Sequence, residues 1–263
     1  MTGQAVLATC VAPLAGGGRL LSSNRKGFTL AEGATHVAML ADVRRYAFTL
    51  AEVLVTLGII GVVSAMTVPS LMQNYQRQSY VTQLHKVYNE LSQALVQYQT
   101  DKNAVNLTEA GLTTNDAAYD FFHKYFKVVK ECESMNDCFA DEYKSIQGSI
   151  VSSYNRAAKS FVLASGASIR VSYAPEGSNF KLLNVGIDVN GKKGPNILGR
   201  DFIFFAVYKN GLIDDYTNDV NDNAPLTKEA RDNMFNTQCN AGAPANSWGC
   251  FGKILNDNWQ MTY

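Results

Sequence analysis

The 263-residue chain has few of the features that catalysis or nucleic-acid binding requires. It contains 3 histidines, and its 23 Lys and Arg residues balance 23 Asp and Glu residues, so the formal net charge is zero. It has no nucleophile elbow, phosphate loop, zincin helix or dinucleotide fingerprint. Without an excess of basic residues it has no electrostatic footprint for nucleic acid. These absences predict neither an enzyme nor a nucleic-acid-binding protein, and no organic cofactor is expected.

Charge is also missing from Val53 to Met72, which contains no Asp, Glu, Lys, Arg or His. A helix of this length measures about 30 Å, the thickness of the hydrocarbon core of a bilayer. A single carboxylate, Glu52, stands at its entrance. Arg44 and Arg45 precede it, which favours a cytoplasmic N-terminal side. The sequence therefore predicts one membrane-spanning helix with the rest of the chain on the outer side.

The residues around this carboxylate carry a family resemblance. The stretch from Ala47 to Leu54, AFTLAEVL, resembles the cleavage and methylation motif of type IV prepilins and type II secretion pseudopilins. Gly58 to Gly61 and Pro69 fit the same family's anchor. The resemblance is strong over residues 44–98 and loose beyond them. It implies a filament subunit of a type II secretion pseudopilus or a type IV pilus, anchored in the inner membrane before assembly into a periplasmic or extracellular filament.

The resemblance also implies how the chain is processed. A prepilin peptidase cuts such proteins between a small residue and Phe, here Ala47 and Phe48, and the new Phe48 amine is methylated; Ala47 replaces the usual Gly. Glu52 then pairs with the N-terminal amine of a neighbouring subunit, because opposite charges attract strongly in a medium of low dielectric constant. The expected partners are the peptidase, the bilayer and other pilin subunits. In an alternative interpretation, Glu52 simply lies at headgroup depth.

Two other N-terminal features leave alternatives open. Residues 27–32, GFTLAE, form a second copy of the box without an apolar continuation, and we interpret it as a remnant of duplication. Translation from Met39 would give a shorter leader. A secretory signal is the rival interpretation of the apolar run: its cleavage site would follow Ala65 and its mature start would be Met66.

The predicted organisation has four parts: a leader (1–47), a transmembrane and assembly helix (48–72), its amphipathic continuation (73–100) and a head domain (101–263). The fold class is α+β, with a long N-terminal helix packed on a small antiparallel sheet, as in pilins. Pro69 is expected to kink this helix. Its second half has apolar residues at three- and four-residue spacing, the stripe of a helix that packs on the head: Leu84, Val87, Tyr88, Leu91, Ala94, Leu95 and Tyr98.

In the head, Asn115 or Asp116 is expected to cap a helix that extends to Val129. A second helix is expected over 141–157 and a short one over 250–255. Strands are predicted at 161–164, 169–173, 182–189 and 202–208, with a last one at 259–263. The 202–208 strand is apolar on both faces and is therefore placed in the centre of the sheet. Ser165-Gly166, Asn190-Gly191 and Asn210-Gly211 are turn signals.

The processed chain keeps four cysteines, whose even number suggests disulfides in an exported domain. Three connectivities are possible. Local pairing is favoured, of Cys132 with Cys138 and of Cys239 with Cys250; the alternative is free thiols.

Two polar segments carry the oxygen ligands that calcium prefers. The first contains Asp188, Asn190, Asn196 and Asp201, and the second contains Asp214 and Asp219. Neither fits the EF-hand pattern, so turn chemistry and surface solvation are the favoured interpretation. A melting temperature insensitive to chelator would count against calcium.

Three classes of function remain open: a structural filament subunit, a minor pilin or surface adhesin, and an anchored or secreted protein that does not assemble. His85 and His123 both lie in helical patterns, so packing or solvation is expected of them.

Overall fold

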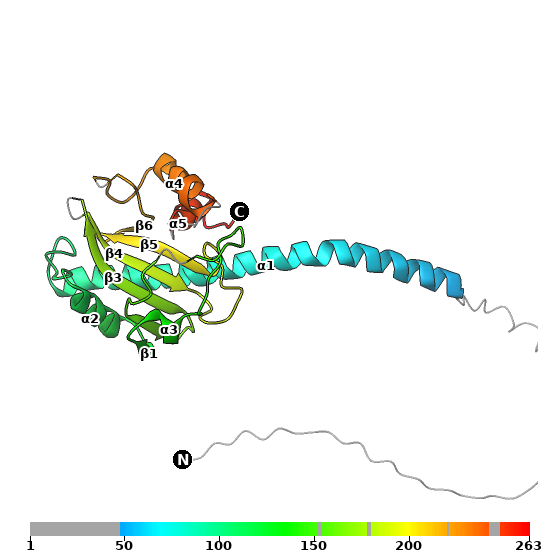
Figure 1. The fold of residues 1–263 in the computed structure, drawn as a ribbon, viewed down its shortest axis with the longest axis horizontal. Helices are drawn as coiled ribbons and strands as arrows, with labels where there is room; N and C mark the ends of the chain where they lie inside the picture. Colours follow the sequence, from blue (N-terminus) through cyan, green and yellow to red (C-terminus); the bar gives the residue numbers. More distant parts are fainter. Residues whose placement is uncertain (1–47, 152–153, 178–179, 220, 242–247) are drawn as a thin grey trace, which may run out of the picture. The chain divides into compact units, whose positions relative to one another are not determined.

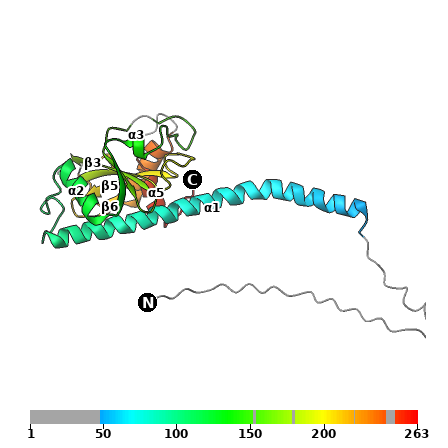
Figure 2. The same cartoon turned by 90° about the horizontal axis from the view of Figure 1, so that it is seen from below.

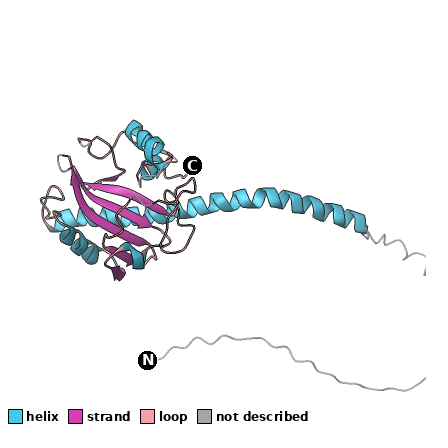
Figure 3. Ribbon diagram, viewed as in Figure 1, coloured by secondary structure: helices cyan, strands magenta, loops and turns pink. Residues whose placement is uncertain are grey.

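A computed structural model of the chain describes residues 48–151, 154–177, 180–219, 221–241 and 248–263. The described residues fall into two units, one up to Gly58 and one from Ile59 onward. The elements are α1 (Leu50–Asp101), α2 (Asn115–Tyr125), β1 (Val128–Cys132), α3 (Met135–Cys138), β2 (Ser160–Leu163), β3 (Ser168–Glu176), β4 (Lys181–Asp188), β5 (Phe202–Tyr208), β6 (Ile213–Asp214), α4 (Lys228–Met234), the π-helical turn η1 (Phe235–Cys239) and α5 (Cys250–Asn256). The predicted α+β class, a long N-terminal helix with an antiparallel sheet, is confirmed (Figure 3).

The second half of α1 packs on the head through the apolar stripe expected from the sequence. Its buried residues recur every three or four positions, so they share one face of the helix: Val81, Leu84, Val87, Leu91, Ala94, Leu95 and Tyr98. They belong to one core cluster with side chains of the sheet, such as Ile169, Val185 and Phe205. The helix therefore runs along one face of the sheet (Figure 2).

The sheet is an antiparallel meander of six strands in the order β1 to β6 (Figure 1). Tight turns connect β2 to β3 and β5 to β6. Gly166 and Gly211 lie in them with φ of 89° and 85°, a conformation that costs glycine little, and each donates its N–H back across the turn to Leu163 and Tyr208. These two turns are where the sequence predicted them. The β4–β5 connection is longer: it runs past Asn190-Gly191 to Asp201.

The opposite face of the sheet is covered by a coiled segment, where a helix over 141–157 was predicted. That prediction is wrong for the described residues. The side chains of Tyr143 and Tyr154 pack on Phe202 of β5. Between them the chain reverses at Gly148, whose φ of 89° is incompatible with a helix. Burial of these aromatic rings on the sheet thus overrides the local helical pattern.

Three further predictions about the head need correction. Helix α2 is capped by Thr114, whose hydroxyl accepts the Ala117 N–H at 3.1 Å, and it ends at Tyr125, so Val129 lies in the edge strand β1. Strand β5 is buried on both faces, but it is the fifth of six strands and not the central one. The last strand, β6, pairs with only part of it. Residues 259–263 form no strand: the Tyr263 hydroxyl holds the tail by donating to the carbonyl of Gly199 at 2.8 Å.

Candidate processing and assembly site

Helix α1 begins with a capping box made by Thr49 and Glu52. The Thr49 N–H and hydroxyl both donate to Oε2 of Glu52, each at 2.8 Å, and the Glu52 N–H donates to the Thr49 hydroxyl at 3.2 Å. This reciprocal pattern satisfies two backbone donors that a helix start would otherwise leave without partners. The sequence analysis assigned Glu52 to assembly but missed Thr49, although the Thr-x-x-Glu spacing was present in the sequence.

The helix after this box exposes its apolar side chains all round. From Phe48 to Tyr75 the exposed large hydrophobic residues include Leu54, Leu57, Ile59, Ile60, Val62, Val63, Met66, Val68, Leu71 and Met72. The hydroxyl groups of Thr56 and Thr67 donate to backbone carbonyls of the preceding turn at 2.9 Å. Since these polar groups are satisfied within the helix, the segment suits a solvent that cannot form hydrogen bonds.

In length and composition, α1 is the one helix of the described residues that can cross a membrane; its most apolar window has a mean hydropathy of 2.0 and no buried residue. Phe48 is 81% exposed and lies in non-helical backbone directly before the helix. Its predicted cleavage partner, Ala47, lies outside the described residues. Pro69 lies inside the continuous helix α1, and a kink at this position stays a prediction.

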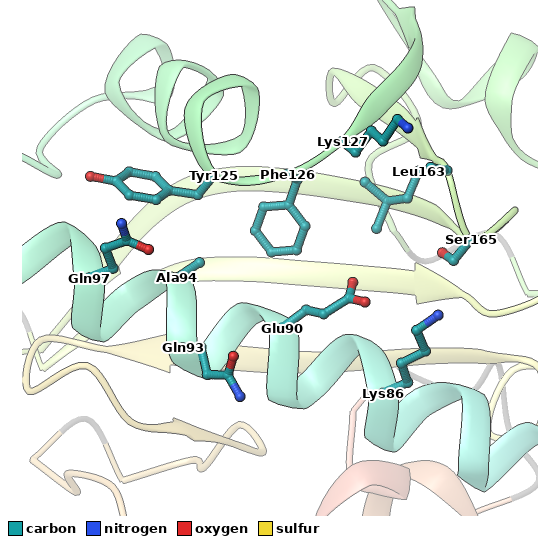
Figure 4. Close-up of a pocket in the computed structure, with 11 residues that line it drawn as sticks. Lys86, Glu90, Gln93, Ala94, Gln97, Tyr125, Phe126, Lys127, Leu163 and Ser165 are labelled. Carbon is teal, nitrogen blue, oxygen red and sulfur yellow. The ribbon is translucent and has the colours of Figure 1, made fainter. Parts of the chain in front are cut away.

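The back half of α1 borders an open groove of about 430 Å³, shown in Figure 4. The helix contributes Lys86, Glu90, Gln93 and Gln97, and the opposite wall includes Phe126 and Ser165. The four α1 side chains make no hydrogen bond or ion pair with another described residue, so they are free for solvent.

The first candidate calcium segment folds as a set of carboxylate-supported turns. Asp201 accepts the N–H groups of Asn196 and Ile197 at 2.7 and 2.6 Å. Asp188 accepts the hydroxyl of Tyr143 and the N–H of Asn190. Burial, and secondarily Asp201, raise the pKa of Asp188 to about 8.

Two amide oxygens of this segment, Oδ1 of Asn190 and of Asn196, are buried and accept no hydrogen bond from a described residue. However, no group of three or more His, Cys, Asp or Glu residues is arranged to hold a metal ion within the described part of the chain. Calcium binding therefore stays a prediction for this segment.

In the second candidate segment, the two carboxylates lie in different surroundings. Asp214 is buried and forms a bidentate pair with Arg231 of α4, with nitrogen–oxygen distances of 2.8 and 2.6 Å, and it accepts the Leu226 N–H at 2.9 Å. Asp219 is exposed and accepts the N–H of Asn221. Asp214 thus fastens α4 to the edge of the sheet through a bidentate, charge-assisted pair.

The neighbouring Asp215, which the sequence analysis did not single out, is a structural carboxylate. It is fully buried and accepts the N–H groups of Tyr216, Gly249 and Gly252 at 2.7, 2.9 and 2.6 Å. It thereby caps the N-terminus of α5, which lacks a side-chain cap of its own. Burial raises the pKa of Asp215 to about 6, against the opposing effect of the three N–H donors. Only tertiary contacts reveal this role, because 34 residues separate Asp215 from Gly249.

Two disulfides join the four cysteines locally, Cys132 with Cys138 and Cys239 with Cys250. The first connects β1 to α3 at the edge of the sheet. The second joins η1 to the first residue of α5, beside the carboxylate cap of that helix. The two described histidines both contact neighbouring side chains: His85 stacks on Trp259 with ring centroids 4.0 Å apart, and Nε2 of His123 lies 3.0 Å from Oε2 of Glu131.

An exposed apolar helix headed by a single carboxylate, continuing into an α+β head with an antiparallel sheet, defines a pilin-like protein. The family model of the prokaryotic N-terminal methylation motif matches residues 43–68. This is the prepilin-type signal of type IV pilins and pseudopilins, and the chain is pilin-like in carrying it at the start of its apolar helix. No curated protein and no solved structure matches the chain at a significant level. The motif, with the apolar helix, indicates membrane anchoring, and proteins that carry it are in general structural.

Proposed function

We propose that the chain is a structural subunit of a type IV pilus or type II secretion pseudopilus-like filament. In this proposal, prepilin peptidase cleaves between Ala47 and Phe48, the Phe48 amine is methylated, and subunits polymerise through α1. The precursor spans the inner membrane once, with the leader in the cytoplasm and the head outside. The absence of enzymatic activity is part of the same proposal.

The proposal rests on one overlap. The methylation motif, residues 43–68, includes both Glu52 and most of the exposed apolar segment that follows it. A charge on a surface of this kind is costly in lipid unless it has a partner. The amine created by cleavage at Phe48 would be such a partner, supplied by the neighbouring subunit. Two local disulfides in the head are consistent with export to an oxidising compartment.

The cleavage is tested by mass spectrometry of the membrane fraction, from cells with and without prepilin peptidase. We expect a mature chain that begins at methylated Phe48 when the peptidase is present, and an uncleaved precursor when it is absent. A mature chain that begins at Met66 would show a secretory signal instead and would overturn the proposal.

Assembly is tested by Glu52→Ala, with Glu90→Ala as the matched control, since Glu90 is a carboxylate on the same helix that pairs with no other described residue. Glu52→Ala should leave membrane insertion intact and abolish incorporation into filaments, whereas Glu90→Ala should assemble normally. Normal assembly of Glu52→Ala would favour the anchored protein that does not polymerise. A minor pilin would show the same dependence on Glu52 but would be a small fraction of the filament.

A further inference from the structure

We propose that the groove between α1 and residues 258–262, the tail groove, binds the phosphate group of an anionic phospholipid through Arg77. The lipid belongs to the leaflet of the membrane that faces the head. This inference rests on one part of the proposed function, the membrane insertion of α1, and it does not depend on assembly into a filament.

The tail groove has a volume of about 560 Å³. One wall is α1 from Asn74 to Thr82, and the other is the C-terminal tail from Asn258 to Thr262. Figures 1 and 2 both show the end of the chain beside α1, where this helix leaves the head. The described lining residues include amides, hydroxyl groups and the guanidinium group of Arg77, and none of them is acidic. The groove therefore offers hydrogen-bond donors and a positive charge.

The position of the groove along α1 corresponds to the headgroup layer of a bilayer. The uncharged run of the helix ends at Met72, and Arg77 follows five residues later. At 1.5 Å per residue, this places Arg77 about 7.5 Å beyond the run along the helix axis. The polar layer on each side of the hydrocarbon core is about 5–8 Å thick. Arg77 thus reaches the lipid phosphates when residues 53–72 span the core, and Tyr75, which is 70% exposed, takes the interfacial position that aromatic residues favour.

Arg77 has no counterion within the described chain. It is half-buried, yet its guanidinium group forms no hydrogen bond or ion pair with a residue that the structure describes. A second guanidinium group, that of Arg200, lies near it: burial raises the pKa of Tyr263, and the positive charges of Arg200 and Arg77 both oppose this effect. Nε of Arg200 is buried and has no acceptor either. Two neighbouring cations without acidic partners favour the binding of an anion.

The acidic groups around these two arginines have other partners. Asp201 and Asp188 act electrostatically on Tyr80 of α1, but both are buried and accept hydrogen bonds from the backbone N–H groups of their own loop. Asp257, next to the tail, pairs with Lys253 at 2.9 Å. The positive charge is therefore left for an external anion. A phosphate group suits it, because its oxygens match the planar fork of donors of a guanidinium group.

The apolar part of α1 favours a lipid over a free phosphate ion as the ligand. Because this segment keeps the groove at the membrane surface, headgroup phosphates are present there at a high effective concentration. An anionic headgroup also has a net charge that a zwitterionic one lacks, and attraction to an anionic surface contributes about 1 kcal/mol for each Lys or Arg near it.

The test compares Arg77→Gln with Lys86→Gln, which removes the same charge nine residues further along α1, about 13 Å further from the apolar run. Full-length protein is reconstituted into vesicles of phosphatidylcholine and phosphatidylglycerol in equal amounts. Spin-labelled forms of the two lipids, followed by electron paramagnetic resonance, measure the preference of the protein for phosphatidylglycerol. Extraction with alkaline carbonate checks that each variant stays in the membrane, and thermal unfolding checks the head.

We expect the unmodified chain to prefer phosphatidylglycerol and Arg77→Gln to lower this preference about fivefold, which corresponds to ~1 kcal/mol. Arg77→Lys should keep most of the preference, and Lys86→Gln should keep all of it. Arg200→Gln should lower it by a smaller factor, since Arg200 does not line the groove. The melting temperature of Arg77→Gln should equal that of the unmodified chain, because Arg77 has no partner in the described chain to lose.

The outcomes separate this inference from the proposed function. If Arg77→Gln stays in the membrane and keeps the preference, or if Lys86→Gln loses it equally, the lipid site is wrong and the filament function stands. A lower melting temperature of Arg77→Gln would reveal an internal partner of the guanidinium group and would also overturn the site. Loss of the preference on addition of inorganic phosphate at constant ionic strength would identify a free anion as the ligand instead. If carbonate extracts the unmodified chain, α1 does not insert and the proposed function itself fails.

Discussion

The two halves of α1 have similar apolar side chains and opposite surroundings. In the back half, Val81, Leu84 and Leu91 are buried against the sheet and α5. In the front half, residues such as Leu57 and Ile60 are each 60% exposed, although the segment is the more apolar of the two. The head domain supplies the partner of the back half, whereas nothing in the described chain covers the front half.

This difference shows that the two halves of one continuous helix need different partners. Exposed apolar surface of this extent is rare in soluble monomers and marks a membrane or protein contact. The front half needs lipid or sibling helices, and the back half needs the fold of its own head. Changes in the back half should therefore be measurable in the isolated subunit, and changes in the front half only in the membrane or the filament.

The largest expected effect separates the two halves directly. Leu91→Ala removes a side chain of the back half that is 0% exposed, and it should lower the free energy of unfolding of the head by ~2–5 kcal/mol, because it leaves a cavity. Leu57→Ala, the matched change in the front half, should alter it by less than ~0.5 kcal/mol. Chemical denaturation in detergent measures both. Equal losses would mean that the front half also packs on the head.

A smaller effect is expected from the carboxylate that caps α5, the helix whose Phe251 packs near Tyr88 of the back half. Asp215→Ala leaves three N–H groups, two of them buried, without an acceptor and should cost ~1–3 kcal/mol. Asp219→Ala, in the exposed part of the same acidic run, serves as the control and should cost little. Thermal unfolding compares the two, and similar melting temperatures would refute the capping role.

The smallest expected effect is a pH dependence that comes from the same buried carboxylate. The folded-state pKa of Asp215, about 6, is above the ordinary value of 3.8, so the folded chain binds more protons between about pH 4 and 6. The free energy of unfolding should therefore fall as the pH rises through this window. Asp215→Asn, which cannot ionise, should lack this part of the dependence. A variant whose pH profile parallels that of the unmodified chain would show that Asp215 does not titrate there.

The sequence predicted the elements whose signals are local. The stripe on α1, the tight turns at Ser165-Gly166 and Asn210-Gly211, and the short helix at Cys250 all have their determinants within a few residues. The position of Glu52 at the start of the helix was also predicted, because a single acidic residue before an apolar run is easy to recognise in the sequence. Local pairing of the cysteines agrees with the two disulfides of the structure.

The predictions that failed depended on distant partners. A helix was predicted over 141–157, yet the described residues of this range cover the sheet as coil, because Tyr143 and Tyr154 pack on Phe202 there. The pairing of Asp214 with Arg231, 17 residues further on, likewise had no local signal in the sequence, and calcium binding by the acidic run stays a prediction. Its neighbour Asp215 gave no signal at all, since the N–H groups of α5 that it binds are far away in the sequence.

By itself, the sequence determined that this chain carries a prepilin-type signal, one apolar helix with a lone acid at its start, and an α+β head. Periodicity, charge and turn residues are properties of short segments, and they need no knowledge of the fold. The tertiary structure alone decided which acids support the C-terminal helices and that the rings of Tyr143 and Tyr154 pack on Phe202 of the sheet. These depend on distances between atoms, and only the packing of the folded chain sets those distances.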